Sequence, residues 1–292
     1  MQSRAMRSRI VRRAVRRFLP GERLEDAMVA ARNLRDQGIE SVLTYLGENT
    51  SNRSDAHAVV EQYLEALRRV TALSLPTVVS VKLTQLGLDF DREFCFDNLC
   101  QIIESAPADD IVWIDMEASS YVDATLAIYR RALAIHRNVG VCLQSYLYRT
   151  AKDLESLLPL GPAIRLVKGA YQEPAEIAFR NKADVDRNFF ELAGILFGQE
   201  AQRAHLRAVI ATHDRELIRR IQILTGERGL RKESFAFQML YGIQRGEQLR
   251  LARDGWQVGV LISYGKDWFS WYVRRLAERP ANLLFLLSHL AG

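Results

Sequence analysis

The segment Arg165 to Tyr171, with the sequence RLVKGAY, places two cations next to a glycine. It ends an apolar run, AIRLV, that is typical of a buried β-strand, so Arg165 lies within the strand and Lys168 at its end. Burying a cation costs free energy unless the cation is paired. Gly169 adds bare backbone that a ligand can approach closely. The segment therefore suits an anionic, electron-rich ligand, although alone it establishes no function.

Polar side chains also lie in, or directly after, neighbouring apolar runs. Any one of them alone is explained as well by a structural role as by a functional one. The structural role would be a solvated strand end or an ion pair, such as Lys82 with Asp115. The whole set is harder to explain by packing, because each buried polar group needs a partner. Cations dominate it, and cations favour an anionic cofactor and a carboxylate substrate. The residues are Lys82, Asp115, Glu117, Gln144, Arg165, Lys168, Thr212, His213 and Asp214, with the adjacent pair Arg274 and Arg275 near the C-terminus.

The sequence lacks the residue patterns that are typical of metal sites and of the common phosphate-binding loops. The five histidines show no metal-ligand spacing and the three cysteines form no CxxC, so no metal site is predicted. Neither a Walker-type loop nor a GxGxxG is present. The odd, sparse cysteine count indicates a reducing compartment.

Eight apolar, β-branched runs alternate with stretches of helical periodicity such as residues 55–70 and 123–137. Parallel strands need long crossovers, and eight βα units in roughly 250 residues predict a (β/α)8 barrel. A doubly wound sheet is the alternative, but the turn after the first run lacks a glycine-rich pattern. In such a barrel the chemistry lies at the C-terminal ends of the strands, which is where the polar residues fall. The predicted strands are residues 41–47, 77–83, 111–116, 139–146, 163–168, 206–212, 235–241 and 258–264.

The chain has 292 residues, 48% of them hydrophobic and 26% charged, as in soluble globular proteins. Residues 1–37 are predicted to be a helical segment and residues 38–292 the barrel. No run approaches the ~20 apolar residues of a membrane span. Seven arginines stand within residues 1–17. Such a basic start is more often a solvated helix, and less often binds nucleic acid or an anionic membrane surface.

Long motifs along nearly the whole chain resemble those of proline dehydrogenases, the flavin-dependent enzymes of proline catabolism, in their short single-function bacterial form. That family has a distorted (β/α)8 barrel preceded by helices. The resemblance implies oxidation of L-proline to 1-pyrroline-5-carboxylate by hydride transfer to N5 of FAD, with a quinone as the next electron acceptor. The motifs are FLPGERLEDAM, LTYLGEN, VKLTQLGLD, IDMEAS, LQSYLYRTAKDL, RLVKGAYQEP, ATHD, FAFQMLYG and YGKDWFSWYVRRLAERPANLL.

The resemblance implies a role for each matching position. Arg165 would face the flavin N5 and act in catalysis together with Asp115, which would support the cationic side of the pocket. Lys82, Arg274 and Arg275 would hold the substrate carboxylate, and Leu240 would form an apolar wall. Further cofactor contacts would come from Met116, Gln144, the backbone of Lys168, Gly169 and Ala170, and, toward the phosphates, Thr212 and His213. The expected location is the cytoplasm, with peripheral contact at the inner face of the membrane as an open alternative because quinones reside in bilayers; no specific nucleic acid is expected.

Leu261 departs from the family pattern. Counting back from GKDW without a gap aligns it with the family's substrate-facing tyrosine, so apolar packing is kept and a hydroxyl is lost. Hydroxyproline-oxidising relatives carry a smaller residue there, a change that Leu261 does not copy. One open alternative is therefore the same flavin chemistry on another cyclic or N-substituted amino acid, such as hydroxyproline. A second alternative, of a different class, rests on the arginine-rich start and is a protein that binds nucleic acid or a membrane surface.

Overall fold

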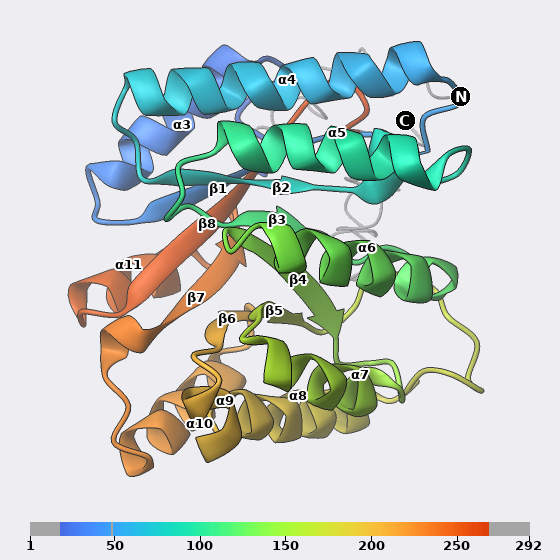
Figure 1. Ribbon diagram of the computed structural model, residues 1–292. Coiled ribbons are helices and arrows are strands. Elements are labelled where there is room, and N and C mark those ends of the chain that lie inside the picture. The colour runs from blue at the N-terminus through green and yellow to red at the C-terminus, as the bar shows by residue number, and fades with distance from the viewer. Residues whose placement is uncertain (1–17, 48, 269–292) are drawn as a thin grey trace, which may run out of the picture.

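The chain folds into a closed barrel of parallel strands, as a computed structural model shows for residues 18–47 and 49–268 (Figure 1). Each strand pairs with the next along the chain, and β8 pairs with β1 to close the barrel. The strands are β1 Glu40–Tyr45, β2 Thr77–Val81, β3 Val112–Ile114, β4 Val139–Gln144, β5 Ala163–Val167, β6 Arg207–Ala211, β7 Phe235–Leu240 and β8 Gln257–Tyr264.

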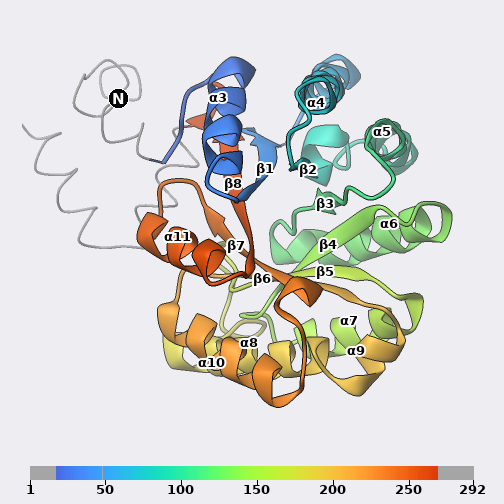
Figure 2. The same ribbon diagram turned by 90° about the vertical axis from the view of Figure 1, so that its left-hand side faces the viewer.

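Helices connect the strands and cover the outside of the barrel (Figure 2). They are α3 Leu24–Arg35, α4 Arg53–Ala72, α5 Arg92–Ser105, α6 Val122–Ile135, α7 Thr150–Leu157, α8 Lys182–Leu196, α9 Gln199–Arg203, α10 Arg215–Glu227 and α11 Arg245–Arg253. The 3-10 helices are η1 Leu83–Leu86, η2 Ser119–Tyr121, η3 Leu158–Leu160 and η4 Lys232–Ser234. The predicted (β/α)8 barrel is thus confirmed, with all eight strands in place, and the doubly wound sheet is excluded.

Capping side chains fix where several helices begin after the strands. Asn52 accepts a hydrogen bond from the backbone of Asp55 at the start of α4, and Asp91 and Asp214 cap α5 and α10 in the same way. Such a side chain satisfies backbone N–H groups that have no partner within the helix. Helix α3 comes before the first strand and packs on β1 and β8. Whether residues 1–37 form a unit of their own stays a prediction.

Tyr63 of α4 separates the C-terminal ends of β1 and β2. The two strands pair only from Ser41 with Thr77 to Leu43 with Val79. Beyond that point the Tyr63 hydroxyl accepts a hydrogen bond from the Tyr45 backbone N–H at 3.2 Å and donates one to the Ser80 carbonyl at 2.9 Å. A side chain thereby replaces a direct link between strands and distorts this side of the barrel.

The barrel interior has an apolar layer and a polar layer. Side chains alternate between the two faces of a strand, and the contacts of Arg165 with residues of β2, β4 and β7 identify the inward-facing set. Polar side chains gather toward the C-terminal ends of the strands, which is the end that carries the chemistry in such barrels. The apolar layer consists of Val42, Trp113, Ala163 and Val209, with Val78, Ile111, Ala236 and Leu261 packed around them.

Among residues 18–47 and 49–268, none of the helices combines the length and the apolar character that crossing a bilayer requires.

Candidate active site

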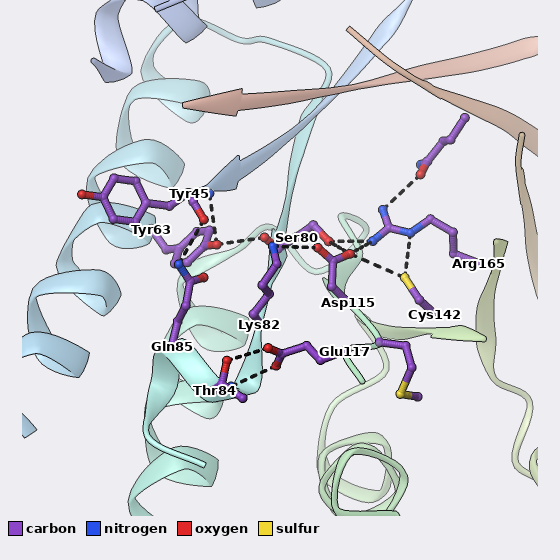
Figure 3. Close-up of polar contacts among 12 residues, drawn as sticks. Tyr45, Tyr63, Ser80, Lys82, Thr84, Gln85, Asp115, Glu117, Cys142 and Arg165 are labelled. Carbon is purple, nitrogen blue, oxygen red and sulfur yellow. Dashed lines mark hydrogen bonds and ion pairs between the residues drawn. The ribbon is translucent and has the colours of Figure 1, made fainter. Parts of the chain in front are cut away.

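Arg165 is the centre of the polar layer (Figure 3). Its side chain is 4% exposed, and it makes contacts to four other strands or strand ends. Nε donates to Cys142 Sγ at 2.8 Å, and Nη1 donates to Gln238 Oε1 at 3.1 Å. Nη2 donates to Ser80 Oγ at 2.6 Å and to Asp115 Oδ1 at 2.5 Å. A guanidinium has five N–H groups, so within the described residues one N–H of Nη1 is left for a ligand.

Asp115 holds two cations at the end of β3. Its other carboxylate oxygen lies 3.4 Å from Lys82 Nζ, and Ser80 Oγ donates to its Oδ1 at 2.8 Å. Burial acts to raise the pKa of the Asp115 carboxyl, but Lys82 and Arg165 outweigh this and hold the pKa below its ordinary value. Burial acts to lower the pKa of Arg165, and Cys142 and Asp115 outweigh it, so that the pKa is raised. The cluster therefore carries one anion and two cations, with an excess of positive charge.

Gln144 lies beside this cluster at the end of β4. Its Nε2 donates to the carbonyls of Met116 and Glu117 at 3.2 and 3.1 Å, which fixes the orientation of the amide. Its Oε1 is buried and has no partner within the described part of the chain. The carboxylate of Glu117 is also buried and accepts from the backbone N–H and the hydroxyl of Thr84, at 3.1 and 2.5 Å. Gln144 thus presents a fixed acceptor that a ligand can satisfy.

Gly169 lets the ring of Tyr146 approach its bare backbone, while the close approach of a ligand at this position stays a prediction. Its φ is +111°, and a Cβ built there would lie 2.3 Å from the ring of Tyr146. Only glycine fits that conformation and that contact without strain. The side chain of Lys168 meanwhile lies 2.5 Å from Asp186 and 3.0 Å from Asp214. The cation of Lys168 is therefore used to join β5 to α8 and α10, while its backbone continues into the glycine.

Asp214 ties this corner together. It caps α10 and pairs with both Lys168 and Lys182. Burial acts to raise the pKa of its carboxyl, but the hydrogen bonds from the two lysines outweigh this and hold the pKa far below its ordinary value. The backbone N–H of Asp214 donates to the hydroxyl of Thr212, which is 5% exposed. The ends of β5 and β6 are therefore held in a fixed relative position.

His213 lies just after β6 and Leu240 at the end of β7, whereas Leu261 lies within β8, three residues before its end. His213 Nε2 accepts from the backbone N–H of Leu240 at 2.9 Å, so the ring links β6 to β7. Leu240 is paired in register with Leu261, and Leu261 packs on the apolar layer of the barrel. The register and the alternation of side chains place both leucines on the inner face, beside Gln238. They form an apolar wall next to the cationic cluster.

The loop after β5 is anchored across the neighbouring strand ends. Glu173 accepts from the backbone N–H of Ser119 at 2.7 Å and from its hydroxyl at 2.5 Å. Ala178 forms an isolated antiparallel bridge with Leu147. These contacts connect the loop to the segments that follow β3 and β4, and so hold it near the mouth of the barrel.

The structure brings most of the predicted site residues to one end of the barrel. Lys82, Asp115, Met116, Gln144, Arg165, Lys168, Gly169, Ala170, Thr212, His213, Leu240 and Leu261 all lie at or near the C-terminal ends of their strands. Arg274 and Arg275 lie outside the described residues, as do residues 1–17 with their arginines.

Three side chains that accept hydrogen bonds from Arg165 were not predicted from the sequence. Each stands two positions before a residue that had been placed in the site, and residues two apart on a strand share a face. That alternation was the signal that would have found them. They are Ser80, before Lys82; Cys142, before Gln144; and Gln238, before Leu240.

The fold and the site together define a barrel enzyme with a cationic, ligand-binding mouth, and comparison with known proteins gives its family. The family model described as Proline dehydrogenase matches residues 27–287. Proline dehydrogenase 1 from Bacillus subtilis (strain 168) is 37% identical over 278 residues, covering 95% of this chain and 90% of that protein. Proline dehydrogenase from Deinococcus radiodurans is 36% identical over 282 residues, covering 93% and 88%. The chain belongs to the proline dehydrogenase family, and it is therefore an oxidoreductase that acts on a CH–NH donor.

A solved structure supports the same fold. Proline utilization A (PutA) from Bdellovibrio bacteriovorus, inactivated by N-propargylglycine, is similar with a TM-score of 0.82 at 22% identity. The match covers 91% of this chain and 32% of that one, so the chain spans about a third of that protein. At this identity the likeness concerns the barrel alone.

Proposed function

We propose that this protein oxidises L-proline to 1-pyrroline-5-carboxylate with FAD as its cofactor and passes the electrons to a quinone. The observation that carries the proposal is the cluster of Arg165, Asp115 and Lys82 at the mouth of a proline dehydrogenase barrel. The cluster offers net positive charge to a carboxylate substrate and to an electron-rich cofactor. The wall of Leu240 and Leu261 beside it suits an aliphatic ring.

The residues at the strand ends fit a flavin. The unpartnered Oε1 of Gln144 accepts a hydrogen bond from a ligand N–H, and the isoalloxazine ring carries such a group. The ring of Tyr146 packs against the bare backbone of Gly169, where any other residue would place a Cβ, and this contact fixes the course of residues 168–170. We infer that Met116, Gln144 and the backbone of residues 168–170 would hold the ring. Thr212 and His213 would hold the cofactor toward its phosphates.

FAD, when bound, would supply the hydride acceptor at N5. Arg165 keeps its positive charge because its pKa is raised, and it has one N–H left for a ligand. A fixed cation of this kind stabilises negative charge that develops beside it without having to reorganise. Asp115 holds Arg165 and Lys82 in place, and its lowered pKa keeps it ionised near neutral pH. Lys82, held by Asp115, would direct its ammonium group at the substrate carboxylate, together with Arg274 and Arg275, which lie outside the described residues.

The experiment that tests this function is a product assay. The FAD-loaded protein, given L-proline and a soluble quinone, should form 1-pyrroline-5-carboxylate, which is trapped as a coloured adduct with an aromatic amine. Omitting proline or FAD should abolish the product. A protein that holds FAD and forms no product with any of several quinones would refute the proposal. Adding lipid vesicles with a membrane quinone tests peripheral contact with the bilayer, which should raise the turnover rate if contact occurs.

Leu261 makes the choice of substrate a separate test. It lies on the inner wall beside Leu240, where a leucine offers packing but no hydrogen bond. A panel of L-proline, hydroxyproline, pipecolate and thiazolidine carboxylate should be oxidised fastest at proline, because the apolar wall disfavours a ring hydroxyl. If another compound of the panel were oxidised faster, that compound would replace L-proline as the proposed substrate. Deleting residues 1–17 should leave the rate with proline unchanged, and lost nucleic-acid or membrane binding in that variant would support a second role for the basic start.

A further inference from the structure

Trp113 lies directly below the guanidinium of Arg165. It stands on β3 two positions before Asp115 and is 3% exposed. The central guanidinium carbon lies 5.0 Å from the centroid of the ring, a distance at which a cation is attracted to an aromatic face. Gly140 is paired in register with Trp113 on β4, and a Cβ at Gly140 would lie 2.7 Å from the ring. The missing side chain at Gly140 thus makes the space that the indole fills.

Cys142 holds the same guanidinium from the side. It is paired in register with Arg165 on the adjacent strand, and its Sγ lies 2.8 Å from Nε and 3.6 Å from Asp115 Oδ1. Burial raises the pKa of the Cys142 thiol to about 12, so the group is neutral. A neutral thiol can accept from Nε and donate to the carboxylate at the same time. Cys142 therefore connects the two charged groups of the cluster.

These contacts fix a planar group in two independent ways. The thiol engages Nε, which is the N–H nearest the side-chain stem, and so sets the tilt of the guanidinium within its plane. The indole ring of Trp113, whose centroid lies 5.0 Å from the guanidinium carbon, belongs to the apolar layer and so limits how far the guanidinium can approach that layer. Ser80, Gln238 and Asp115 contact only the terminal nitrogens.

We propose that Cys142 and Trp113 are positioning residues for Arg165. They hold its guanidinium in place, with one N–H of Nη1 left without a partner among the described residues. The proposal rests on the proposed function, since it concerns the residue placed nearest the reacting atoms. Lys82 is paired with Asp115 and not with either of these side chains. Their loss should therefore slow flavin reduction while the apparent affinity for proline stays close to that of the wild type.

The kinetic test compares two buried thiols. Cys142→Ala and Cys95→Ala each remove a buried sulfur, but Cys95 belongs to the apolar core and its thiol donates to the carbonyl of Leu83. In anaerobic single-turnover experiments with L-proline, Cys142→Ala should reduce the flavin about 10-fold more slowly, because a small misplacement of a catalytic group is costly. Cys95→Ala should match the wild type, and Cys142→Ser should recover most of the rate, since a hydroxyl also accepts from Nε.

Trp113 is tested in the same way. Trp113→Phe keeps an aromatic face and should lose less than Trp113→Leu, and Trp256→Leu is the control. Trp256 packs with Phe235 and Phe237 and also lies near a cation, Lys232, but outside the barrel. Equal rates in all these variants would overturn the proposal.

A second readout needs no cofactor. The Nε–H of Arg165 should give a slowly exchanging NMR signal in the apoprotein, because it is buried and bonded to sulfur; the signal is assigned by its loss in Arg165→Lys. It should shift and exchange faster in Cys142→Ala and stay unchanged in Cys95→Ala. A signal that is identical in both variants would overturn the proposal even if Cys142→Ala were slow or unstable. Should wild-type protein fail to oxidise proline while the signal responds as expected, the proposed function would fall and the positioning of Arg165 would stand.

Discussion

Replacing Gly169 with alanine should disrupt the ligand cradle, and the structure allows the cost to be divided into two parts. The first is conformational: φ is +111°, a value that costs an L-residue about 1–3 kcal/mol. The second is steric, because the new Cβ would lie 2.3, 2.4 and 2.6 Å from three ring carbons of Tyr146. Carbon atoms normally approach to roughly 3.5–4.0 Å, so the ring or the loop must move by more than ~1 Å. Overpacking of this kind costs about 1–3 kcal/mol.

Gly229 supplies a matched control. It also has a positive φ, +67°, but a Cβ there would meet nothing within 4 Å. Gly229→Ala should therefore show only the conformational cost, about 1–2 kcal/mol, and lower Tm by about 2 °C per kcal/mol in a chain of this size. Gly169→Ala should lower Tm by at least twice as much, and should also retain less FAD after gel filtration. Adding Tyr146→Leu should recover part of the lost stability, because it removes the clashing ring.

Differential scanning calorimetry and the ratio of flavin to protein absorbance provide the two measurements. If Gly169→Ala matched Gly229→Ala both in Tm and in FAD content, the close approach of Tyr146 to bare backbone would have no role in the cradle. If Gly169→Ala lost stability and still bound FAD like the wild type, the steric argument would hold and the placement of the cofactor at Gly169 would be wrong.

Three further substitutions test the cluster and the barrel. Arg165→Ala should keep FAD but slow flavin reduction by about 100-fold or more, because it removes the fixed charge beside the reacting atoms; turnover at the wild-type rate would exclude that role. Asp115→Asn should be less stable than the wild type at neutral pH, and the difference should shrink as the pH falls below the ordinary pKa of an aspartate. The reason is that the folded pKa of Asp115 lies below 3.8, so its ion pairs stabilise above that value and are lost as the pH falls through the folded pKa; a difference in urea unfolding free energy that is constant with pH would contradict this. Tyr63→Phe should cost about 1–3 kcal/mol, because it leaves two buried backbone groups of β1 and β2 without partners. Tyr148→Phe is the control for this substitution. It should lower the unfolding free energy by no more than about 0.5 kcal/mol, because the Tyr148 side chain is 49% exposed.

The fold could be predicted because its signals are local. Each strand is a short apolar run between helical periodicities, and β4 is buried along its whole length, as a parallel barrel strand should be. Strand ends agreed within a few residues. The separation of β1 and β2 by Tyr63 could not be foreseen, because it depends on the reach of a side chain from a helix 18 residues away in sequence.

Only part of the candidate site could be predicted from the sequence, because some of its contacts depend on residues that are far apart in the chain. Polar residues within apolar strands, such as Asp115 and Arg165, can be recognised in the sequence as site candidates, because a buried polar group needs a partner. Cys142 and Trp113 belong equally well to an apolar core by type, and only the register that sets them against Arg165 and Gly140 shows otherwise. Lys168 was correctly placed at a strand end, yet its pairing with Asp186 depends on how α8 returns to the barrel.

We propose that proline reduces a flavin beside Arg165 at the polar end of this barrel. The most direct measurement is the visible absorption spectrum of the FAD-loaded protein, recorded anaerobically before and after L-proline is added, for the wild type and for Arg165→Ala. We expect that the yellow wild-type protein bleaches within seconds and that the variant, equally yellow, bleaches far more slowly. A wild-type spectrum that proline leaves unchanged, or a variant that bleaches as fast as the wild type, would contradict it.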